Sequence, residues 1–393
     1  MKKYQLVWAA AMLLVATVSG AWCEEEGAAA ALEKIGAKIT RDENQFGKPV
    51  IKLVYIGSDL NDANLKDLAE LKQLQSLTIN SIVVTDAGLK GLSELTKLQS
   101  LDLESCKLKD TGLKELAGLT KLRVLKIGTT AVTNAGLKQL AGLKQLETLD
   151  ISNTKVTDKG LRELAGLNSL RTLNLMLTQV TDTGLKELAG LKSLQSLDLL
   201  QTRVTDTGLK ELAVLKELQS LELGETKVTD AGLKELAALK ELQSLELYGT
   251  VVTNAGLKEL AALKKLRKLD LVNTKVTDAG LKDLVALKHL KDLSLGGRPM
   301  GVTPEGLKEL AALEKLESLK LTSMEVTHTL VKELAALEQL RTLILEYTKL
   351  TDTGLKELAA LKQLQVLSFP GTSVKYQGLA KLKKALPKCI IRP

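Results

Sequence analysis

The side chains that could perform catalysis or hold a metal are few and far apart in this sequence. The two histidines, His289 and His328, occupy different places in the repeat described below, and the three cysteines, Cys23, Cys106 and Cys389, have no C-x-x-C spacing. A catalytic nucleophile needs a base within hydrogen-bonding distance, and a zinc ion needs several closely placed nitrogen or sulfur ligands. No G-x-G-x-x-G or G-x-x-x-x-G-K-[ST] phosphate loop occurs either. We therefore predict no catalytic residue, no metal and no cofactor, and a protein that is not an enzyme.

The N-terminus has the features of an export signal. Lys2 and Lys3 precede an apolar run from Leu6 to Val18, and three small residues follow at 19–21. The run is too short to span a bilayer, which requires roughly 20 apolar residues, and no later stretch is apolar enough to do so. We predict that residues 1–21 are a signal peptide and that the protein is secreted, periplasmic or attached to the cell envelope. Retention of this segment is the alternative.

The rest of the chain repeats itself every 24 residues. The segments LQSLDLLQTRVTDTGLKELAVLKE, LQSLELGETKVTDAGLKELAALKE and LQSLELYGTVVTNAGLKELAALKK begin at Leu194, Leu218 and Leu242. Thirteen units can be aligned, with one two-residue insertion, and they open at Leu74, Leu98, Leu122, Leu146, Leu170, Leu194, Leu218, Leu242, Leu266, Leu290, Leu316, Leu340 and Leu364. A period of this length with L-x-x-L-x-L is typical of a solenoid that has one strand and one helix per coil.

Each half of the unit has its own hydrophobic period. The second and third leucines of L-x-x-L-x-L alternate with polar residues, as in a strand buried on one face, whereas the leucines of G-L-K-E-L-A-x-L recur every three residues, as in a helix. The Asp or Asn of V-T-[DN] falls where the helix begins, so we expect it or the adjacent Thr to cap the helix. Acid-first pairs such as Asp206 with Lys210 and Asp230 with Lys234 are expected to interact along the helix. One unit buries too little to fold alone, so the coils must stack.

The segment LxxLxLxxTxVTDxGL resembles the cysteine-containing class of leucine-rich repeats, with Thr where that class has Cys. The likeness covers residues from about 50 to 386. With the lead-in ALEKIGAKITRDENQFGKPVIKLVYI, the chain is most similar to secreted leucine-rich-repeat proteins of planctomycete-type bacteria. A weaker similarity to the repeat half of F-box ubiquitin-ligase receptors rests on the recurring ITDxGL pattern, although no F-box segment is present. The resemblance implies an α/β leucine-rich-repeat solenoid, a ribonuclease-inhibitor-like horseshoe with its parallel sheet on the concave side and its helices on the convex side.

This organisation divides the chain into four parts. We expect a signal peptide at 1–21, an N-terminal helical cap and lead-in at 22–49, the solenoid at 50–386, and a C-terminal tail at 387–393. Within the solenoid, a first capping coil precedes the thirteen regular repeats.

Two repeated residues need a structural explanation. A Thr recurs in the slot where leucine-rich repeats place Asn or Cys, and we expect its hydroxyl to satisfy backbone groups of adjacent turns. Cys106 fills the same slot as a buried small residue, whereas Ile82, Arg298 and Met324 interrupt the column. The Gly of T-D-x-G-L lies in the first helical turn, where a side chain would crowd the neighbouring coil. The column of Thr comprises Thr130, Thr154, Thr178, Thr202, Thr226, Thr250, Thr274, Thr348 and Thr372.

Binding is the function that a solenoid favours, because its exposed strand positions form an extended concave surface. The central exposed position holds Asp102, Lys126, Asp150, Asn174, Asp198, Glu222, Glu246, Asp270 and Ser294, six of which are acidic, and Glu104 adds to the next column. Lysines instead follow the helix leucines, as at Lys210, Lys234 and Lys258. The formal net charge of +8 therefore conceals an acidic inner stripe and a basic outer one. Such a stripe attracts a basic protein and fits a nucleic acid poorly, while the outer lysines could contact anionic envelope polymers.

Three features point to a contact site, and each has a structural alternative. Stacked like charges destabilise a sheet, which argues that the acidic stripe has a use, although it could simply keep the sheet soluble. Met176, Leu177, Leu200 and Tyr248 are large side chains in columns that are polar or small in most coils, which indicates either partner anchors or repeat drift. Val272 and Tyr347 fall in the same columns. The irregular segment SLGGRPMGVTPEGL, which contains Arg298, indicates either a contact loop or a tolerated insertion.

The sequence therefore predicts an exported, non-catalytic scaffold that recognises a protein through its concave face. The candidate partner-binding residues are Asp102, Glu104, Asp150, Met176, Leu177, Asp198, Leu200, Glu222, Glu246, Tyr248, Asp270 and Arg298. The alternative is a structural or envelope-associated protein without a dedicated concave ligand. A substrate receptor of the F-box type is a remote analogy, because fold does not determine role.

Overall fold

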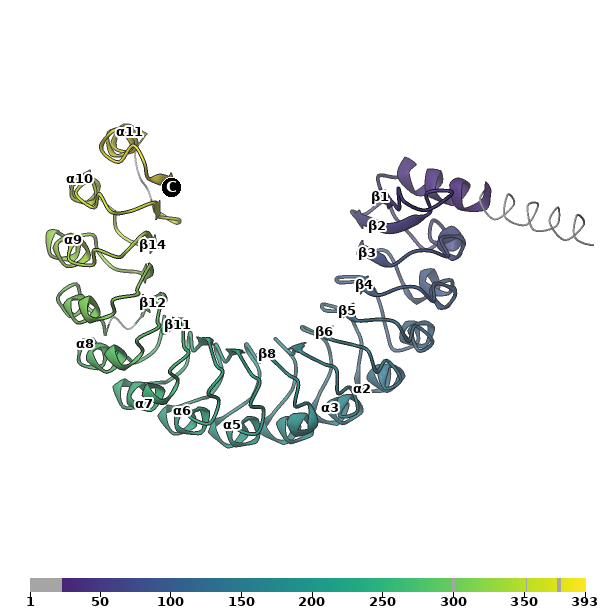
Figure 1. Ribbon diagram of the computed structural model, residues 1–393, viewed down its shortest axis with the longest axis horizontal. Helices are drawn as coiled ribbons and strands as arrows, with labels where there is room; N and C mark the ends of the chain where they lie inside the picture. The colour runs from purple at the N-terminus through teal and green to yellow at the C-terminus, as the bar shows by residue number, and fades with distance from the viewer. Residues whose placement is uncertain (1–22, 299–300, 351, 373–375) are drawn as a thin grey trace, which may run out of the picture. The chain divides into compact units, whose positions relative to one another are not determined.

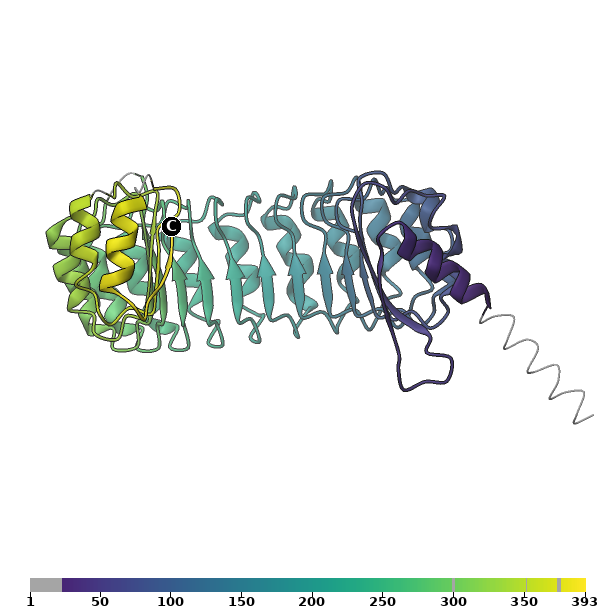
Figure 2. The ribbon, with the colours of Figure 1, turned by 90° about the horizontal axis from the view of Figure 1, so that it is seen from above.

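The computed structural model describes residues 23–298, 301–350, 352–372 and 376–393, so the expected signal peptide at 1–21 lies outside the described residues. The chain forms two compact units, one ending at Gln179 and the other beginning at Val180. In both units each coil places a strand on one side and a helical segment on the other (Figures 1 and 2). Among the described residues, no helix is both long enough and apolar enough to cross a membrane.

In the first unit, a helix of residues 23–34 precedes a sheet whose strands follow chain order. Its strands are β1 (Lys38–Arg41), β2 (Val50–Ile56), β3 (Ser76–Asn80), β4 (Ser100–Asp102), β5 (Val124–Lys126), β6 (Thr148–Asp150) and β7 (Thr172–Asn174). Its further helical segments, several of them 3-10 helices, are η1 (Lys66–Glu70), η2 (Asp86–Leu89), η3 (Leu92–Glu94), η4 (Gly112–Leu116), α2 (Asn134–Leu137), η5 (Lys138–Leu140), α3 (Asp158–Leu161) and η6 (Arg162–Leu164). β1 is antiparallel to β2, and the later pairings are parallel.

The second unit continues with parallel strands in chain order. Its strands are β8 (Ser196–Asp198), β9 (Ser220–Glu222), β10 (Ser244–Glu246), β11 (Lys268–Asp270), β12 (Asp292–Gly296), β13 (Ser318–Thr322), β14 (Thr342–Glu346), β15 (Val366–Ser368) and β16 (Ile390–Arg392). Its helical segments are α4 (Asp182–Leu185), η7 (Lys186–Gly190), α5 (Asp206–Leu212), α6 (Asp230–Leu236), α7 (Asn254–Glu259), η8 (Leu260–Ala262), α8 (Asp278–Leu281), η9 (Lys282–Ala286), η10 (Glu305–Ala312), α9 (His328–Ala335), α10 (Asp352–Leu358) and α11 (Tyr376–Ala385).

The sequence period becomes the register of the sheet. Ser220 on β9 pairs with Ser244 on β10, 24 residues later, whereas Asp292 on β12 pairs with Ser318 on β13, 26 residues later. The connection between β12 and β13 therefore absorbs the two inserted residues without shifting the strands. This register confirms the alignment of the repeats made from the sequence.

Alternation on the strands and the three-residue spacing on the helices produce one apolar core between the two layers. On β10, Leu245 is fully buried, while Ser244 and Glu246 on either side of it are partly exposed. On α6, Leu233 and Leu236 are fully buried against the sheet. Both periodicity predictions are confirmed.

The Thr column is buried as expected, except for the half-buried Thr372, but its hydrogen bonds are local. Thr250 donates its hydroxyl to the carbonyl oxygen of Leu247, three residues earlier in the same coil, at 2.6 Å. The expectation of contacts to adjacent turns was wrong for these hydroxyls. The turn after the strand is tight, so the carbonyl oxygen three residues earlier in the same coil lies within reach of each hydroxyl. Cys106 is 2% exposed and donates to the carbonyl oxygen of Ile79 in the preceding coil at 3.4 Å. Burial raises the pKa of this thiol to about 11.

The Asp of the repeat joins neighbouring coils instead of pairing along its own helix. Asp230 Oδ1 accepts the backbone N–H of Thr253 at 2.7 Å, and Asp230 Oδ2 accepts the Thr253 hydroxyl at 2.6 Å. Thr253 itself caps α7, with its hydroxyl accepting the N–H of Ala255 at 3.2 Å. Both oxygens of Asp230 are thus engaged in the next coil, so the expected pairing with Lys234 was wrong. The same arrangement links Asp206 to Thr229.

The repeated Gly makes room for this carboxylate. A Cβ on Gly256 would lie 2.5 Å from Asp230 Oδ1 and 3.2 Å from Asp230 Cα. A Cβ on Gly208 would lie at the same 2.5 Å from Asp182 Oδ1. The Gly therefore serves packing between coils, as the sequence predicted.

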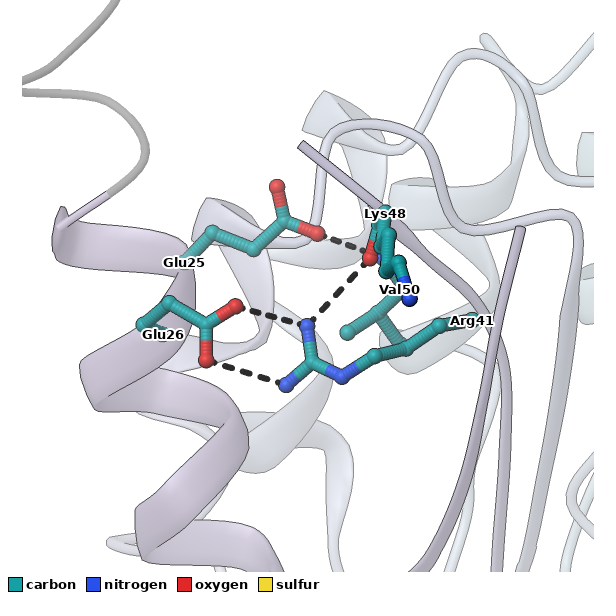
Figure 3. A network of polar contacts seen from close by, with 5 residues as sticks. All are labelled: Glu25, Glu26, Arg41, Lys48 and Val50. Atoms are coloured by element: carbon teal, nitrogen blue, oxygen red, sulfur yellow. Dashed lines mark hydrogen bonds and ion pairs between the residues drawn. The ribbon is translucent and has the colours of Figure 1, made fainter. Parts of the chain in front are cut away.

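The N-terminal helix is fastened to the β1–β2 hairpin by a polar network (Figure 3). Glu25, which is 8% exposed, accepts the backbone N–H of Val50 at 2.6 Å. Arg41 forms two bonds with the Glu26 carboxylate, at 2.7 and 3.1 Å, and a third with the carbonyl oxygen of Lys48 at 3.3 Å. These contacts hold the helix over the N-terminal end of the apolar core.

Candidate functional site

The strand face of the second unit contains a hollow of about 750 Å³. Its volume falls in the range of roughly 300 to 1,000 Å³ that is typical of ligand sites. The side chains come from strands between β9 and β14 and from the turns that follow strands of the same unit. The lining consists of Leu200, Glu222, Glu246, Tyr248, Asp270, Val272, Asn273, Arg298, Lys320, Thr322, Ser323, Glu346 and Tyr347.

Acidic residues of successive strands stack across this face. Asp198 pairs in register with Glu222, Glu222 with Glu246, and Glu246 with Asp270. Adjacent strands are about 4.8 Å apart, so the carboxylates repel one another. Burial, together with the carboxylates of Glu246, Asp198 and Asp270, raises the pKa of Glu222 to about 7 against the opposing effect of the Gly224 N–H. The acidic stripe predicted from the sequence is confirmed within this unit.

The same carboxylates also shape the turns after the strands. Asp198 accepts the N–H of Leu200 at 2.9 Å, Glu222 that of Gly224 at 2.8 Å, and Asp270 that of Val272 at 2.8 Å. Each bond joins a strand residue to the residue two positions later and uses one carboxylate oxygen. This role was not predicted from the sequence, although an acid two residues before a turn is a signal that could have suggested it. A structural reason for the acids therefore exists beside any contact role.

Basic side chains lie at the other end of the hollow. The column that contains Glu246 and Asp270 continues through Ser294 to Lys320 on β13. Lys320 Nζ forms an ion pair with Glu346 at 2.5 Å. Arg298 is exposed, and its backbone N–H is bound by Asn273 Oδ1 at 2.9 Å. Within the described residues, no carboxylate forms an ion pair with the Arg298 guanidinium.

Two tyrosines line the hollow. Tyr248 donates its hydroxyl to Glu225, which lowers the pKa of the Glu225 carboxyl and raises that of the tyrosine. Tyr347 is 67% exposed and has a positive φ of 51°. Val272, from the same columns, is only 5% exposed, so its expected exposure was wrong. Leu200 is half-buried beside the acidic column.

Six of the twelve predicted contact residues line the hollow, namely Leu200, Glu222, Glu246, Tyr248, Asp270 and Arg298. Asp198 is the next member of the acidic column. Lys320 was not predicted from the sequence, although it occupies the central strand position of a later coil and continues the same column.

The other five predicted residues belong to the first unit and do not line this hollow. Asp102 accepts the N–H of Glu104 at 3.2 Å, and burial and the carboxylates of Asp102 and Asp150 raise the pKa of Glu104. Asp150 accepts both the N–H and the hydroxyl of Ser152, at 2.9 and 2.6 Å. The remaining two, which follow β7, are Met176, half-buried, and Leu177, 43% exposed.

Comparison with known proteins agrees with this architecture. A leucine-rich-repeat family model matches residues 94–117, 144–165, 166–189, 190–213, 216–237, 262–285 and 339–359. The fold is an α/β leucine-rich-repeat solenoid. The structure of an internalin (inlF) from Listeria monocytogenes is similar to this solenoid, with 24% identity and a TM-score of 0.62 over 90% of this chain and 95% of that one.

Other comparisons add less. A leucine-rich-repeat protein of Leptospira interrogans is 23% identical over 84% of this chain and 92% of that chain, with a TM-score of 0.46. No curated protein matches the sequence. The likenesses to planctomycete proteins and to F-box receptors stay predictions from the sequence.

Within the described residues, no group of three or more His, Cys, Asp or Glu side chains is placed to hold a metal ion.

Proposed function

We propose that this solenoid is an exported, non-catalytic scaffold that binds a protein through the strand face of its second unit. The observation that supports this function best is the hollow of about 750 Å³, which brings six predicted contact residues together. Tyrosines and an arginine are the residue types that most often dominate protein interfaces, and both kinds line it. Four carboxylates against two cations in the lining favour a basic region on the partner.

The alternative is a structural or envelope-associated protein that has no dedicated ligand on its strands. Lys210, Lys234 and Lys258 support it, because they are exposed at equivalent positions of successive coils and could contact anionic polymers. Each of these lysines is followed directly by a glutamate, which reduces the positive potential of that surface. The strand face therefore remains the better candidate. A role like that of F-box substrate receptors has only the analogy of fold in its favour.

A matched pair of charge reversals distinguishes the two functions. One variant changes Asp198, Glu222 and Glu246 to Lys, and the other changes three helix-side lysines, Lys210, Lys234 and Lys258, to Glu. The partner is identified by crosslinking and affinity capture from envelope and extracellular extracts, and its binding to each purified variant is then measured. We expect the strand-face variant to lose binding and the helix-side variant to retain it. The opposite result, with both variants folded by circular dichroism, would support the envelope function instead.

Export is tested separately. The protein recovered from the medium or the envelope should have the mass of a chain that begins after residue 21, as shown by intact-mass spectrometry. A full-length protein confined to the cytoplasm would contradict this part of the proposal without affecting the binding face.

A further inference from the structure

Residues 358–393 carry almost all of the net positive charge of the sequence. They contain seven Lys and Arg side chains and no Asp or Glu, whereas residues 1–357 account for only +1 of the formal net charge of +8. The charge is therefore concentrated in the segment that contains α11 and β16. The seven residues are Lys362, Lys375, Lys381, Lys383, Lys384, Lys388 and Arg392, of which Lys375 lies outside the described residues.

This excess arises because the acids of the repeat are replaced here. The V-T-D-x-G-L-K-E-L of a regular coil becomes V-K-Y-Q-G-L-A-K-L at residues 374–382, so Lys381 occupies the position that Glu357 has in the preceding coil. Lys383 and Lys384 occupy the positions of two alanines. In most other coils a Glu directly follows the exposed Lys of the helix and reduces the positive potential of that surface. The sequence of α11 has no such Glu.

The structure leaves these cations exposed and uncompensated. Leu382 and Leu386 are 1% and 3% exposed, whereas Lys381 and Lys384, three residues apart on α11, share an exposed face on the helix side of the unit (Figure 1). None of the six cations that the structure describes in this segment forms an ion pair with a described carboxylate. Glu357 pairs instead with His328 of α9, at 3.0 Å.

The arrangement of the lysines favours a surface as the partner. Lys362 and Lys388 border a hollow of about 190 Å³ at the C-terminal end of α11, where Lys362 Nζ also donates to the carbonyl oxygen of Ala385 at 2.8 Å. This volume is below the roughly 300 to 1,000 Å³ of typical ligand sites. Lys381 and Lys384 lie on an outward helix face. Lysine is a flexible point charge that accepts phosphates in many orientations, unlike the planar fork of arginine.

The burial of the leucines limits how such a surface is met. A helix that inserts into a bilayer presents its apolar face to the lipid, but that face of α11 packs in the core of the solenoid. Contact would therefore be electrostatic and would stay at the level of the headgroups. A lysine near an anionic membrane strengthens binding by a factor of roughly five, and several lysines together suffice for stable adsorption.

We infer that Lys362, Lys381, Lys384 and Lys388, the basic surface, hold the protein against an anionic phospholipid membrane through contacts with lipid phosphates and without insertion. This inference goes beyond the proposed function, because the basic surface shares no residue with the lining of the strand-face hollow. The second unit would thus bind a protein on its strand face and a membrane at α11.

Vesicle co-sedimentation tests this inference with the protein as it is recovered from the cell. The probes are vesicles of phosphatidylglycerol and phosphatidylcholine in equal parts, and vesicles of phosphatidylcholine alone, which measure binding that does not depend on lipid charge. Combined Lys381→Gln, Lys384→Gln and Lys388→Gln should weaken binding to the anionic vesicles roughly 100-fold, a factor of roughly five for each lysine. Raising the salt concentration from about 0.1 to about 1 M should also weaken the wild type, because the Debye length falls from about 10 to about 3 Å.

A second variant with the same change of net charge is the matched control. It replaces Lys210, Lys234 and Lys258 by Gln, which are exposed but are each followed directly by a glutamate. We expect it to bind within about threefold of the wild type, since the surface that it changes has little net charge. Circular dichroism shows whether both variants fold. Lys381→Gln alone, expected to weaken binding roughly fivefold, replaces the triple variant if that variant does not fold.

Three results would overturn the inference. Equal binding to both kinds of vesicle would show that lipid charge has no part in it. An equal loss in the two triple variants would show that binding follows net charge and not the basic surface. Tighter binding to double-stranded DNA or heparin than to the anionic vesicles, at the same salt concentration, would identify a soluble polyanion as the partner. None of these results affects the strand face, which is tested by its own charge reversals.

Discussion

The contact between Asp230 and the coil that follows it tests how neighbouring coils hold together. Asp230→Ala removes the two hydrogen bonds to Thr253, at 2.7 and 2.6 Å. Asp230→Asn should keep both, because Asn254 already bonds the N–H and the hydroxyl of Thr277 in the equivalent place, at 2.9 and 2.8 Å. Gly256→Ala introduces a Cβ at 2.5 Å from Asp230 Oδ1. The three substitutions therefore probe one contact from both sides.

The expected magnitudes follow from these contacts. A hydrogen bond to a charged group contributes about 1.5 to 3 kcal/mol, and because both bonds share one partly exposed carboxylate we expect Asp230→Ala to lower the free energy of unfolding by about 2 to 4 kcal/mol. Asp230→Asn should lower it by less than about 1 kcal/mol, since a neutral partner keeps both bonds. Overpacking by Gly256→Ala should lower the free energy of unfolding by about 1 to 3 kcal/mol. The higher helix propensity of Ala should offset up to about 1 kcal/mol of this loss. When Asp230→Ala and Gly256→Ala are combined, the carboxylate is gone, so the second substitution should cost about 1 to 2 kcal/mol less than it does alone.

Urea unfolding followed by far-ultraviolet circular dichroism measures these free energies. In a solenoid each coil contacts only its neighbours, so the losses should reflect one interface between coils. The reasoning fails if Asp230→Ala unfolds at the wild-type urea concentration, or if the two substitutions are additive within about 0.5 kcal/mol. Failure of Asp230→Asn to stay close to the wild type would show that the charge, and not the geometry, maintains the contact.

Three further predictions concern single groups. Because the pKa of Glu222 is raised from 4.5 to about 7, the folded state retains a proton that the unfolded chain releases, and the wild type should lose stability as the pH rises through 7. In urea unfolding at pH 8, Glu222→Gln should be more stable than the wild type by about 2 kcal/mol, allowing for the partial exposure of this side chain. Near pH 4 the two proteins should be equally stable. Glu25→Ala removes the 2.6 Å bond to the Val50 amide and should speed hydrogen exchange of that amide at least about tenfold, whereas an unchanged rate would contradict the role of the network in Figure 3. Cys106, with its buried thiol and a pKa of about 11, should react with thiol reagents at pH 8 only after unfolding, and rapid labelling of the native protein would refute its burial.

Several features of the fold could be read directly from the repeat. The 24-residue period predicted the register in which Ser220 pairs with Ser244, and the two-residue insertion predicted the wider step from Asp292 to Ser318. Alternation around Leu245 predicted which side chains of the strand are buried. These predictions succeeded because strand and helix periodicities are properties of the local chain, and because identical units stack in the same way each time.

The candidate site was predicted only in part. The acidic column followed from strand alternation, since every second residue of a strand faces the same side. Lys320 was missed and Val272 was placed wrongly, because a single repeat does not show how deeply a turn residue is buried or which side chains of a later coil line the same hollow. The role of Asp270 in closing the turn at Val272 also depends on the bend of the backbone after the strand.

The sequence by itself determined that the chain is a repeating α/β solenoid, which leucines of each coil are buried, and that the exposed strand positions carry mostly acids. Only the tertiary structure decided that Asp230 bonds to Thr253 in the next coil and that Gly256 leaves space for it. It also decided that Arg298 lines the same hollow as Glu222. The physical reason is that burial follows from a period of a few residues, whereas these contacts join atoms that are 23 or more residues apart and depend on how closely one coil lies against the next.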